Sequence, residues 1–187
     1  MSIDFSLSPE LEEMRLRVRD FIEREVKPVE EVIEREKLAE QDRNGYVSKL
    51  IEMRKKAFAE GLWLPHMPEQ WGGMGLGHVQ LAMVQAEAAK SHYGPWVLNC
   101  QAPDEGNMHT LLHWGTEEQL ENYLKPLCEG RATSCFAMTE PEVAGSDPTL
   151  IQTNGYEDGD EWVINGHKWF ISNAHRASFA ILVVRTE

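Results

Sequence analysis

The sequence predicts an α+β fold, with an N-terminal α-helical domain over residues 1–130 and an antiparallel β-barrel domain over residues 131–187 that is incomplete in this chain. Up to Gly130 the sequence is rich in charged residues and helix formers, with apolar residues three or four positions apart. After Gly130 it is rich in β-branched and aromatic residues in a period-two pattern. Asp158-Gly159 and Asn165-Gly166 are pairs typical of tight hairpin turns.

Helix signals are clear in the first two-thirds of the chain. Ser8 can cap a first helix, Pro9 suits its first position, and Pro28 is expected to end it. A second helix is predicted from about residue 46 to 60, with Gly61 as its left-handed stop. Its expected inward residues are Val47, Leu50, Ile51 and Phe58. Further helices are predicted at about 78–91 and, after a capping box of Thr116 and Gln119, to about residue 127.

The last third predicts five strands, at residues 131–138, 151–157, 161–164, 168–172 and 179–185. Two of the connections are tight turns, which favours an antiparallel meander, like a barrel cut in half.

Composition excludes some classes of function. The net charge of −13 over 187 residues argues against a nucleic-acid partner, because phosphate binding needs a basic patch. The longest apolar run, residues 177–184, is too short to cross a bilayer, and residues 1–13 lack the features of a secretion or transit signal. We therefore expect a cytoplasmic protein. Its three cysteines contain no CxxC pair and are expected to be reduced thiols.

Two motifs resemble ligand-binding sites but are better explained by turn geometry and helix packing. Gly72, Gly73, Gly75 and Gly77 lack the GxGxxG spacing, so turn geometry is favoured over phosphate binding. His109 and His113 are four residues apart, the spacing of two metal ligands on a helix, and His92 is nearby. No carboxylate at a suitable spacing completes the histidine set, so no metal site is predicted.

The stretch from Cys135 to Asn173 carries the strongest functional signal. Two predicted strands end in hydroxyl residues, Thr139 and Ser172, and the loop between them holds Gly145 and Ser146. Apolar walls, hydroxyls at an edge and a glycine where a phosphate approaches suit a flat heterocycle. We interpret the stretch as half of a flavin pocket.

The chain resembles the acyl-CoA dehydrogenase family over essentially its whole length. The segments that carry the resemblance are FAMTEPEVAGSD (136–147), INGHKWFISNA (164–174), LPHMPEQWGGMGLG (64–77) and GTEEQLENYLKPLCEG (115–130). The segment NCQAPDEGNM (99–108) is similar to the long and branched-chain members numbered ten and eleven in animals. The resemblance implies a helical domain, a middle β-barrel and a C-terminal four-helix bundle, of which the first two are represented here, the second incompletely.

The same resemblance assigns roles to individual residues. It implies contacts to FAD from Phe136, Met138, Thr139, Gly145, Ser146, Phe170, Ile171 and Ser172. Ser146 is also implied near the CoA arm, and Ala102 and Gly106 are small residues of the acyl pocket that would leave room for a longer or branched chain. The sequence departs from the family at Ser172, where many members have threonine, and in a 141–145 loop that is one residue longer than the short GAGSD form.

The implied reaction is oxidation of an acyl-CoA thioester to its 2-enoyl form. It removes a proton from Cα and a hydride from Cβ, and the proton needs a base. No residue here matches the family's glutamate base, and Glu140 and Glu142 are expected to be structural or exposed carboxylates. The chain is thus expected to be a fragment without its catalytic base. The resemblance implies electron-transfer flavoprotein as acceptor and a homo-oligomer, a dimer or tetramer, when complete.

Three alternatives stay open. The first is a related flavin oxidase acting on acyl-CoA or a nitroalkane. The second is a non-catalytic subunit that completes the flavin site of a partner. The third is a helical domain with a β appendage and no ligand.

Overall fold

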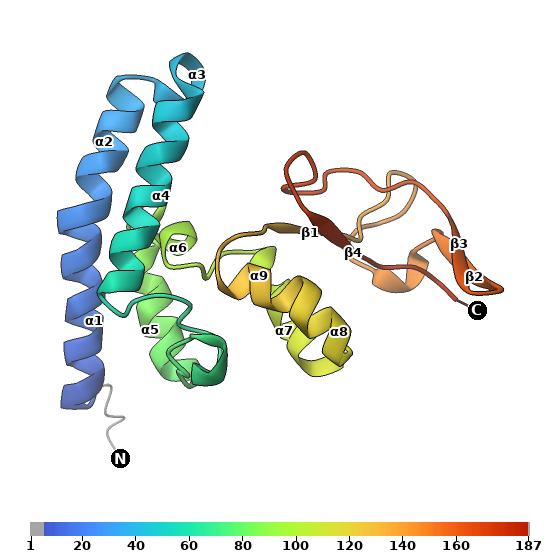
Figure 1. Cartoon of the computed structure of the whole chain (residues 1–187), viewed down its shortest axis with the longest axis horizontal. Coiled ribbons are helices and arrows are strands. Elements are labelled where there is room, and N and C mark those ends of the chain that lie inside the picture. Colours follow the sequence, from blue (N-terminus) through green and yellow to red (C-terminus); the bar gives the residue numbers. More distant parts are fainter. Residues whose placement is uncertain (1–5, 187) are drawn as a thin grey trace. The chain divides into compact units, whose positions relative to one another are not determined.

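The computed structural model describes residues 6–186, which form two compact units, one ending at Gln101 and the other beginning at Ala102. The first unit is helical, and the second holds helices and all the strands found in the described chain (Figure 1). The helices that follow Ala102 belong to the same unit as these strands. The domain boundary at Gly130 stays a prediction.

The first unit is built on two long antiparallel helical segments (Figure 1). One runs from α1 through a π-helical turn, η1, into α2; the other is α4, which α3 precedes. The elements of this unit are α1 (Pro9–Phe21), η1 (Ile22–Val26), α2 (Lys27–Arg35), α3 (Leu38–Gln41), α4 (Arg43–Ala59), the 3-10 turn η2 (Glu69–Trp71), α5 (His78–Ala88) and α6 (Gly94–Val97). Its core includes Val18, Phe21, Met53, Val84 and Leu98, all of them buried.

The first helix begins as predicted but does not end at Pro28. The Ser8 hydroxyl accepts a hydrogen bond from the Leu11 amide at 3.3 Å, which confirms the cap. Pro28 instead lies in the first turn of α2, directly after η1. A proline has no N–H and clashes with the carbonyl four residues earlier, and the wider π turn relieves both problems. The same pattern recurs at Pro126, which follows the π-helical turn η3 (Leu120–Leu124).

The second predicted helix is present as α4, and Gly61 has a left-handed φ of 68°. The predicted inward face was wrong in part, because Val47, Ile51 and Phe58 are exposed. The buried stripe consists of Leu50, Met53 and Ala57. Apolar residues lie on two faces of α4. The spacing of these residues was therefore sufficient to predict a helix, but not to predict which face of the helix is buried.

The second unit begins with a pair of helical segments. They are α7 (Asp104–Trp114) and a continuous run of α8 (Glu117–Gln119), η3 and α9 (Lys125–Cys128). The predicted capping box is confirmed: the Gln119 amide donates to the Thr116 hydroxyl at 3.2 Å, and the Thr116 amide donates to the Gln119 side chain at 2.9 Å.

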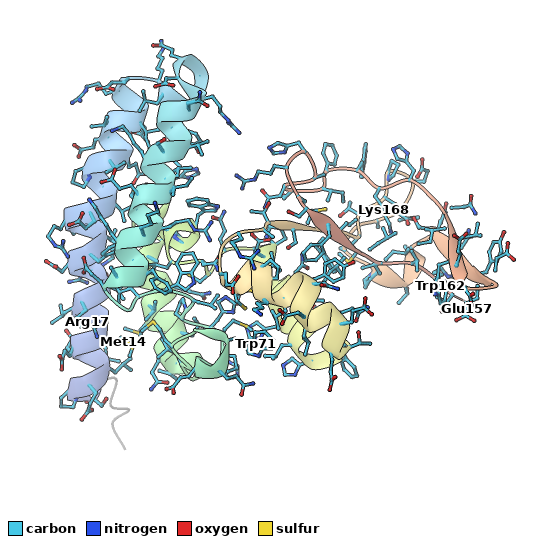
Figure 2. The ribbon with its side chains drawn as sticks, viewed as in Figure 1. Met14, Arg17, Trp71, Glu157, Trp162 and Lys168 are labelled. Carbon is cyan, nitrogen blue, oxygen red and sulfur yellow. The ribbon has the colours of Figure 1, made fainter. Side chains whose placement is uncertain are left out.

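The strands of the second unit form two separate two-stranded sheets. The first pairs β1 (Ser134–Ala137) with β4 (Phe179–Leu182) in parallel. The second is the antiparallel hairpin of β2 (Asn154–Asp158) and β3 (Glu161–Asn165), whose register pairs Glu157 with Trp162 (Figure 2). The 3-10 turn η4 (Pro148–Leu150) lies between β1 and β2.

The predicted antiparallel half-barrel is therefore corrected in two ways. The pairing of β1 with β4 is parallel, and residues 168–172 are not a strand. The strands described within residues 6–186 form two separate two-stranded sheets, and no incomplete barrel is seen. The Asp158-Gly159 turn is confirmed, with Gly159 at a φ of 65°. Asn165 is instead the last residue of β3, and the chain continues from it without a hairpin turn.

All three cysteines are free and buried, in agreement with the prediction of reduced thiols. Burial raises the pKa of the Cys128 thiol to about 12, and the nearby Glu129 carboxylate adds to the effect. A thiol with so high a pKa is a poor nucleophile.

No helix within residues 6–186 has the length and apolar character needed to cross a bilayer.

Candidate functional site

Strand β1 leads to the first group of predicted flavin residues. Ser134, Cys135 and Ala137 are buried, whereas the Phe136 side chain is 39% exposed. Alternate side chains of a strand point to opposite faces, so Phe136 lies on the face opposite that of its two neighbours. The structure thus leaves this aromatic ring accessible to a ligand.

The start of α7 is hydrogen-bonded to β1, which the sequence did not predict. One carboxylate oxygen of Asp104 accepts from both the amide and the hydroxyl of Ser134, each at 2.6 Å. The Asn107 side-chain amide donates to the Ser134 hydroxyl at 2.9 Å and to the Cys135 carbonyl at 3.1 Å. These buried polar contacts tie the helix that carries Gly106 to the strand that carries Phe136. The sequence around Asp104 and Asn107 is polar throughout, so it carries no signal that singles out these two residues.

The second group of predicted flavin residues follows Lys168. The Trp169 amide donates to the Thr139 carbonyl at 3.1 Å, which joins this segment to the end of β1. Phe170 has a left-handed φ of 51° and is 82% exposed. Its ring lies 4.4 Å from that of Trp169, with 37° between the planes. An exposed aromatic residue with this backbone conformation is strained, and such residues gather at functional sites.

Gly145 also lies beside Thr139. A Cβ added at Gly145 would lie 3.5 Å from the Thr139 Cγ2 atom. The next residue, Ser146, is exposed, and Asp147 closes the loop by accepting from the Thr149 amide at 3.0 Å. The structure therefore brings three predicted segments together around Thr139: the residues that follow β1, the loop that holds Gly145, and the segment after Lys168.

Glu140 is buried, with 3% exposure, and its carboxylate is fully hydrogen-bonded. It accepts from Lys168 Nζ at 2.8 Å, the Thr153 hydroxyl at 2.5 Å, the Thr153 amide at 2.8 Å and the Gln152 amide at 2.7 Å. Burial opposes ionisation, but these donors, with Lys168 foremost, outweigh it and lower the pKa of Glu140 to about 2. The sequence prediction of a structural carboxylate agrees with this geometry. Glu142, in contrast, is exposed.

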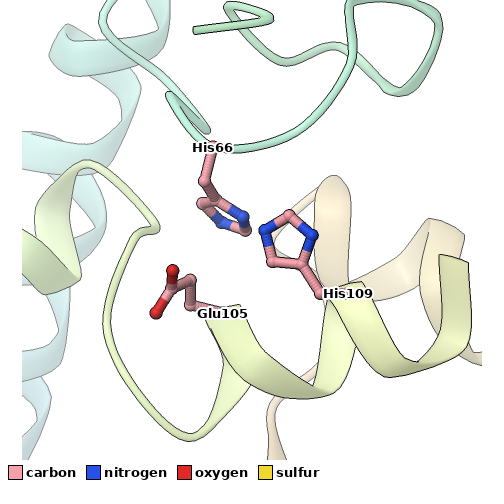
Figure 3. Close-up of side chains that lie close together, drawn as sticks. All are labelled: His66, Glu105 and His109. Atoms are coloured by element: carbon pink, nitrogen blue, oxygen red, sulfur yellow. The ribbon is translucent and has the colours of Figure 1, made fainter. Parts of the chain in front are cut away.

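The predicted acyl-pocket residues lie at the start of the second unit. Ala102 is exposed, and Gly106 is in the first turn of α7 with open space beyond its Cα. The described contacts do not join either residue to Ser146. Glu105 and His109 project from α7 one turn apart (Figure 3). Gly106 directly precedes Asn107 on this helix. The contacts of Asn107 with β1 therefore also fix the position of Gly106.

The histidines discussed above have aromatic neighbours. The rings of His109 and His113 stack with centroids 6.3 Å apart and 17° between planes. The His92 ring packs edge-on against Tyr93 at 5.2 Å.

A hollow of about 360 Å³ opens beside α7, lined among others by Leu111, Tyr123 and Phe179. None of the predicted flavin residues lines it. The hollow is therefore separate from the residues gathered around Thr139.

Comparison with known proteins decides the family. The family model described as the acyl-CoA dehydrogenase N-terminal domain matches residues 8–131, and that of the middle domain matches residues 135–187. The chain belongs to the acyl-CoA dehydrogenase family. The chain is 42% identical over 171 residues to mouse acyl-CoA dehydrogenase family member 10, and 38% identical over 181 residues to human family member 11.

Among solved structures, a protein from Mycobacterium abscessus assigned to the acyl-CoA dehydrogenases matches with a TM-score of 0.78 and 38% identity over 89% of this chain. A glutaryl-CoA dehydrogenase from Mycobacterium smegmatis, solved in complex with FADH2, shares the fold with a TM-score of 0.70 and 24% identity over 97% of this chain.

The chain is much shorter than its relatives. The alignments cover 89% and 94% of this chain but 16% of mouse member 10 and 23% of human member 11. They cover 43% and 44% of the two solved chains.

Proposed function

We propose that the chain is a part of a longer FAD-dependent acyl-CoA dehydrogenase, which oxidises an acyl-CoA thioester to 2-enoyl-CoA. One observation carries the proposal. The hydrogen bond from the Trp169 amide to the Thr139 carbonyl joins the two segments, 136–139 and 170–172, that the family resemblance assigns to the flavin.

The residues around Thr139 suit a flavin. The exposed rings of Phe136 and Phe170 offer apolar faces, as a flat heterocycle requires. Within residues 6–186, the hydroxyls of Thr139 and Ser172 make no hydrogen bond to another residue, so both can serve a ligand. We assign Phe136, Met138, Thr139, Gly145, Ser146, Phe170, Ile171 and Ser172 to FAD.

Each group has a separate task in this proposal. Bound FAD supplies the acceptor for the hydride that leaves Cβ, a role that protein side chains cannot fill. The Thr139 and Ser172 hydroxyls orient the ring by hydrogen bonds at its edge. The Met138 carbonyl already accepts from Lys168 Nζ, so its N–H is the backbone group proposed for the flavin.

The base that takes the Cα proton is proposed to lie outside this chain. Glu140 cannot serve at neutral pH, because its pKa is held at about 2 and its lone pairs accept four hydrogen bonds. Glu142 is exposed, whereas a catalytic base of this kind needs dry surroundings.

The family resemblance supports two further proposals, electron-transfer flavoprotein as the acceptor and a homo-oligomeric complete protein. The cytoplasmic location stays a proposal from the sequence alone. The open space beyond Gly106 and the small side chain of Ala102 support a longer or branched acyl chain. A sharp preference for four-carbon acyl-CoA over longer ones would contradict that substrate class.

Anaerobic addition of an acyl-CoA series to the complete protein, purified with FAD, tests the function. We expect loss of the oxidised flavin absorbance and one enoyl-CoA formed per flavin reduced. Thr139→Val should weaken FAD retention, whereas Glu142→Gln, at an exposed position of the same loop, should not.

Three results would contradict the proposal or redirect it. Failure to hold FAD would exclude it. Rapid peroxide formation in air, in place of electron transfer to a carrier protein, would favour an oxidase. Flavin binding only on addition of a second, longer homologue would favour the partner-subunit alternative.

A further inference from the structure

The Glu140 carboxylate is a junction between separate segments of the second unit. Its four hydrogen bonds come from two places, residues 152–153 before β2 and Lys168 after β3. Glu140 itself follows Thr139 directly and lies three residues after the end of β1. A single buried side chain thus holds two stretches, which begin 12 and 28 residues after it in the sequence, against its own segment.

Lys168 is the cation of this junction, and its side chain is only 9% exposed. The Lys168 side chain is labelled in Figure 2, where it lies in the second unit. Its Nζ atom donates to the Glu140 carboxylate and to the Met138 carbonyl, each at 2.8 Å. The next residue, Trp169, donates its amide to the Thr139 carbonyl. Lys168 and Trp169 together therefore hold three consecutive residues, 138–140.

Gly166 completes the junction by its lack of a side chain. A Cβ added there would lie 2.2 Å from the Thr153 hydroxyl oxygen and 2.5 Å from the Thr153 Cβ. Such a contact is too close for any residue but glycine unless the backbone moves. The chain leading to Lys168 is therefore packed directly on Thr153, the residue that gives Glu140 two of its hydrogen bonds.

A buried ion pair with every group hydrogen-bonded fixes geometry more than it adds stability, because desolvation offsets much of the attraction between the charges. Here the fixed geometry concerns the segments that carry the flavin residues. Met138 and Thr139 are on one side of the pair, and Phe170 follows Lys168 by two residues. No other buried ion pair in the described part of the second unit joins these two segments.

We infer that Glu140 and Lys168 are positioning residues for the flavin site, which hold the Met138–Thr139 backbone in register with the segment from Phe170 to Ser172. This inference rests on the proposed flavin function. The pair itself does not touch substrate or take part in proton transfer. Its role is to fix the relative position of the backbone groups and the exposed ring of Phe170 before FAD binds.

The test compares five variants of the complete protein with the wild type. Lys168→Met and Glu140→Gln each remove one charge, and the double variant removes both without leaving a buried charge. Lys125→Met is the matched control, because Lys125 forms an exposed ion pair with Glu121 in the same unit. Lys168→Arg keeps the charge but places it on a wider, planar group.

Two readouts are needed. Without FAD, amide hydrogen exchange at Thr153 and Trp169 should become about tenfold or more faster in Lys168→Met, because both amides are held by the junction. With FAD, the dissociation constant should rise about tenfold and the visible flavin spectrum should shift. Lys168→Arg should recover part of both effects, and Lys125→Met should match the wild type in both.

Each possible result decides the inference. Unchanged exchange at Thr153 and Trp169 in Lys168→Met and Glu140→Gln would overturn it, whatever happens to FAD. Faster exchange with an unchanged FAD dissociation constant and spectrum would show a structural role only, and would also overturn it. A wild-type protein that binds no FAD would overturn the proposed function first, and this inference with it. Both effects together, absent from the control, would support it.

Discussion

Phe170 shows at the scale of a single residue how this site differs from the core. Its ring is 82% exposed, and its backbone has a φ of 51° that a bulky residue rarely adopts. Asn173 has a φ of 69° only three residues later. Local preference does not favour this conformation, so neighbouring contacts such as that of Trp169 with Thr139 must hold it. An exposed and strained aromatic residue is therefore better explained by ligand contact than by folding.

Phe170→Gly tests this explanation. The exposed ring contributes little burial, and glycine adopts a positive φ freely, so the free energy of unfolding should change by no more than about 1 kcal/mol. The FAD affinity of the complete protein should fall about tenfold, because a ring contact is lost. Urea unfolding and FAD titration measure the two quantities. Phe170→Leu keeps an apolar side chain and should lose less affinity; equal affinity in all three proteins would contradict the assignment of Phe170 to the flavin.

At the scale of elements, the contact of α1 with α5 is organised by one buried carboxylate. Glu87 on α5 accepts from Arg15 at 2.6 Å and from Arg19 at 2.9 Å, both on α1. Burial opposes ionisation of Glu87, but Arg19, Lys90 and Arg15 outweigh it and lower its pKa from an ordinary 4.5 to about 2. This network stabilises the first unit and has no part in the proposed site.

The sign of the resulting pH dependence follows from the lowered pKa. The contribution of Glu87 to the stability of the fold is complete above about pH 4.5 and is lost as the pH falls toward 2. Glu87→Gln should therefore unfold more easily at pH 7, by about 1–3 kcal/mol. Its stability should also vary less between pH 4.5 and 2. Urea unfolding across this range measures both, with Glu13→Gln, an exposed position on α1, as control. Parallel stability curves for wild type and Glu87→Gln would contradict the prediction.

Local signals in the sequence were sufficient for elements that depend on a few neighbouring residues. The Ser8 cap, the Thr116–Gln119 capping box and the Asp158-Gly159 turn all involve residues within three positions of each other. Pro28 was misjudged because the preceding π turn has no simple sequence signature.

Long-range pairing could not be predicted in the same way. The parallel pairing of β1 with β4 joins Ser134 to Phe179, so no turn motif indicates it. The segment from Lys168 to Ser172 resembles a strand in composition, but in the structure the Lys168 ammonium and one backbone hydrogen bond join it to residues 138–140. The contacts of Asp104 and Asn107 with β1 were missed for the same reason. The candidate residues themselves came from the family resemblance, and their gathering around Thr139 came from the structure.

At the scale of the whole molecule, the two units have different tasks in our proposal. The first is a helical body with its own core and the Glu87 network. The second carries every residue assigned to FAD, with the Glu140–Lys168 pair between its two motifs. The base and the rest of the pocket are proposed to come from further chain, as expected for a sequence that covers 43% of a solved relative.

In our proposal, residues 136–146 and 168–172 form one side of a flavin site. The most direct measurement is amide hydrogen exchange of the complete protein with and without FAD. We predict slower exchange on FAD addition in these two segments and little change in α1, α4 or the glycine loop at residues 72–77. Protection confined to residues 72–77, or no protection within residues 136–172, would contradict the assignment of these segments to FAD.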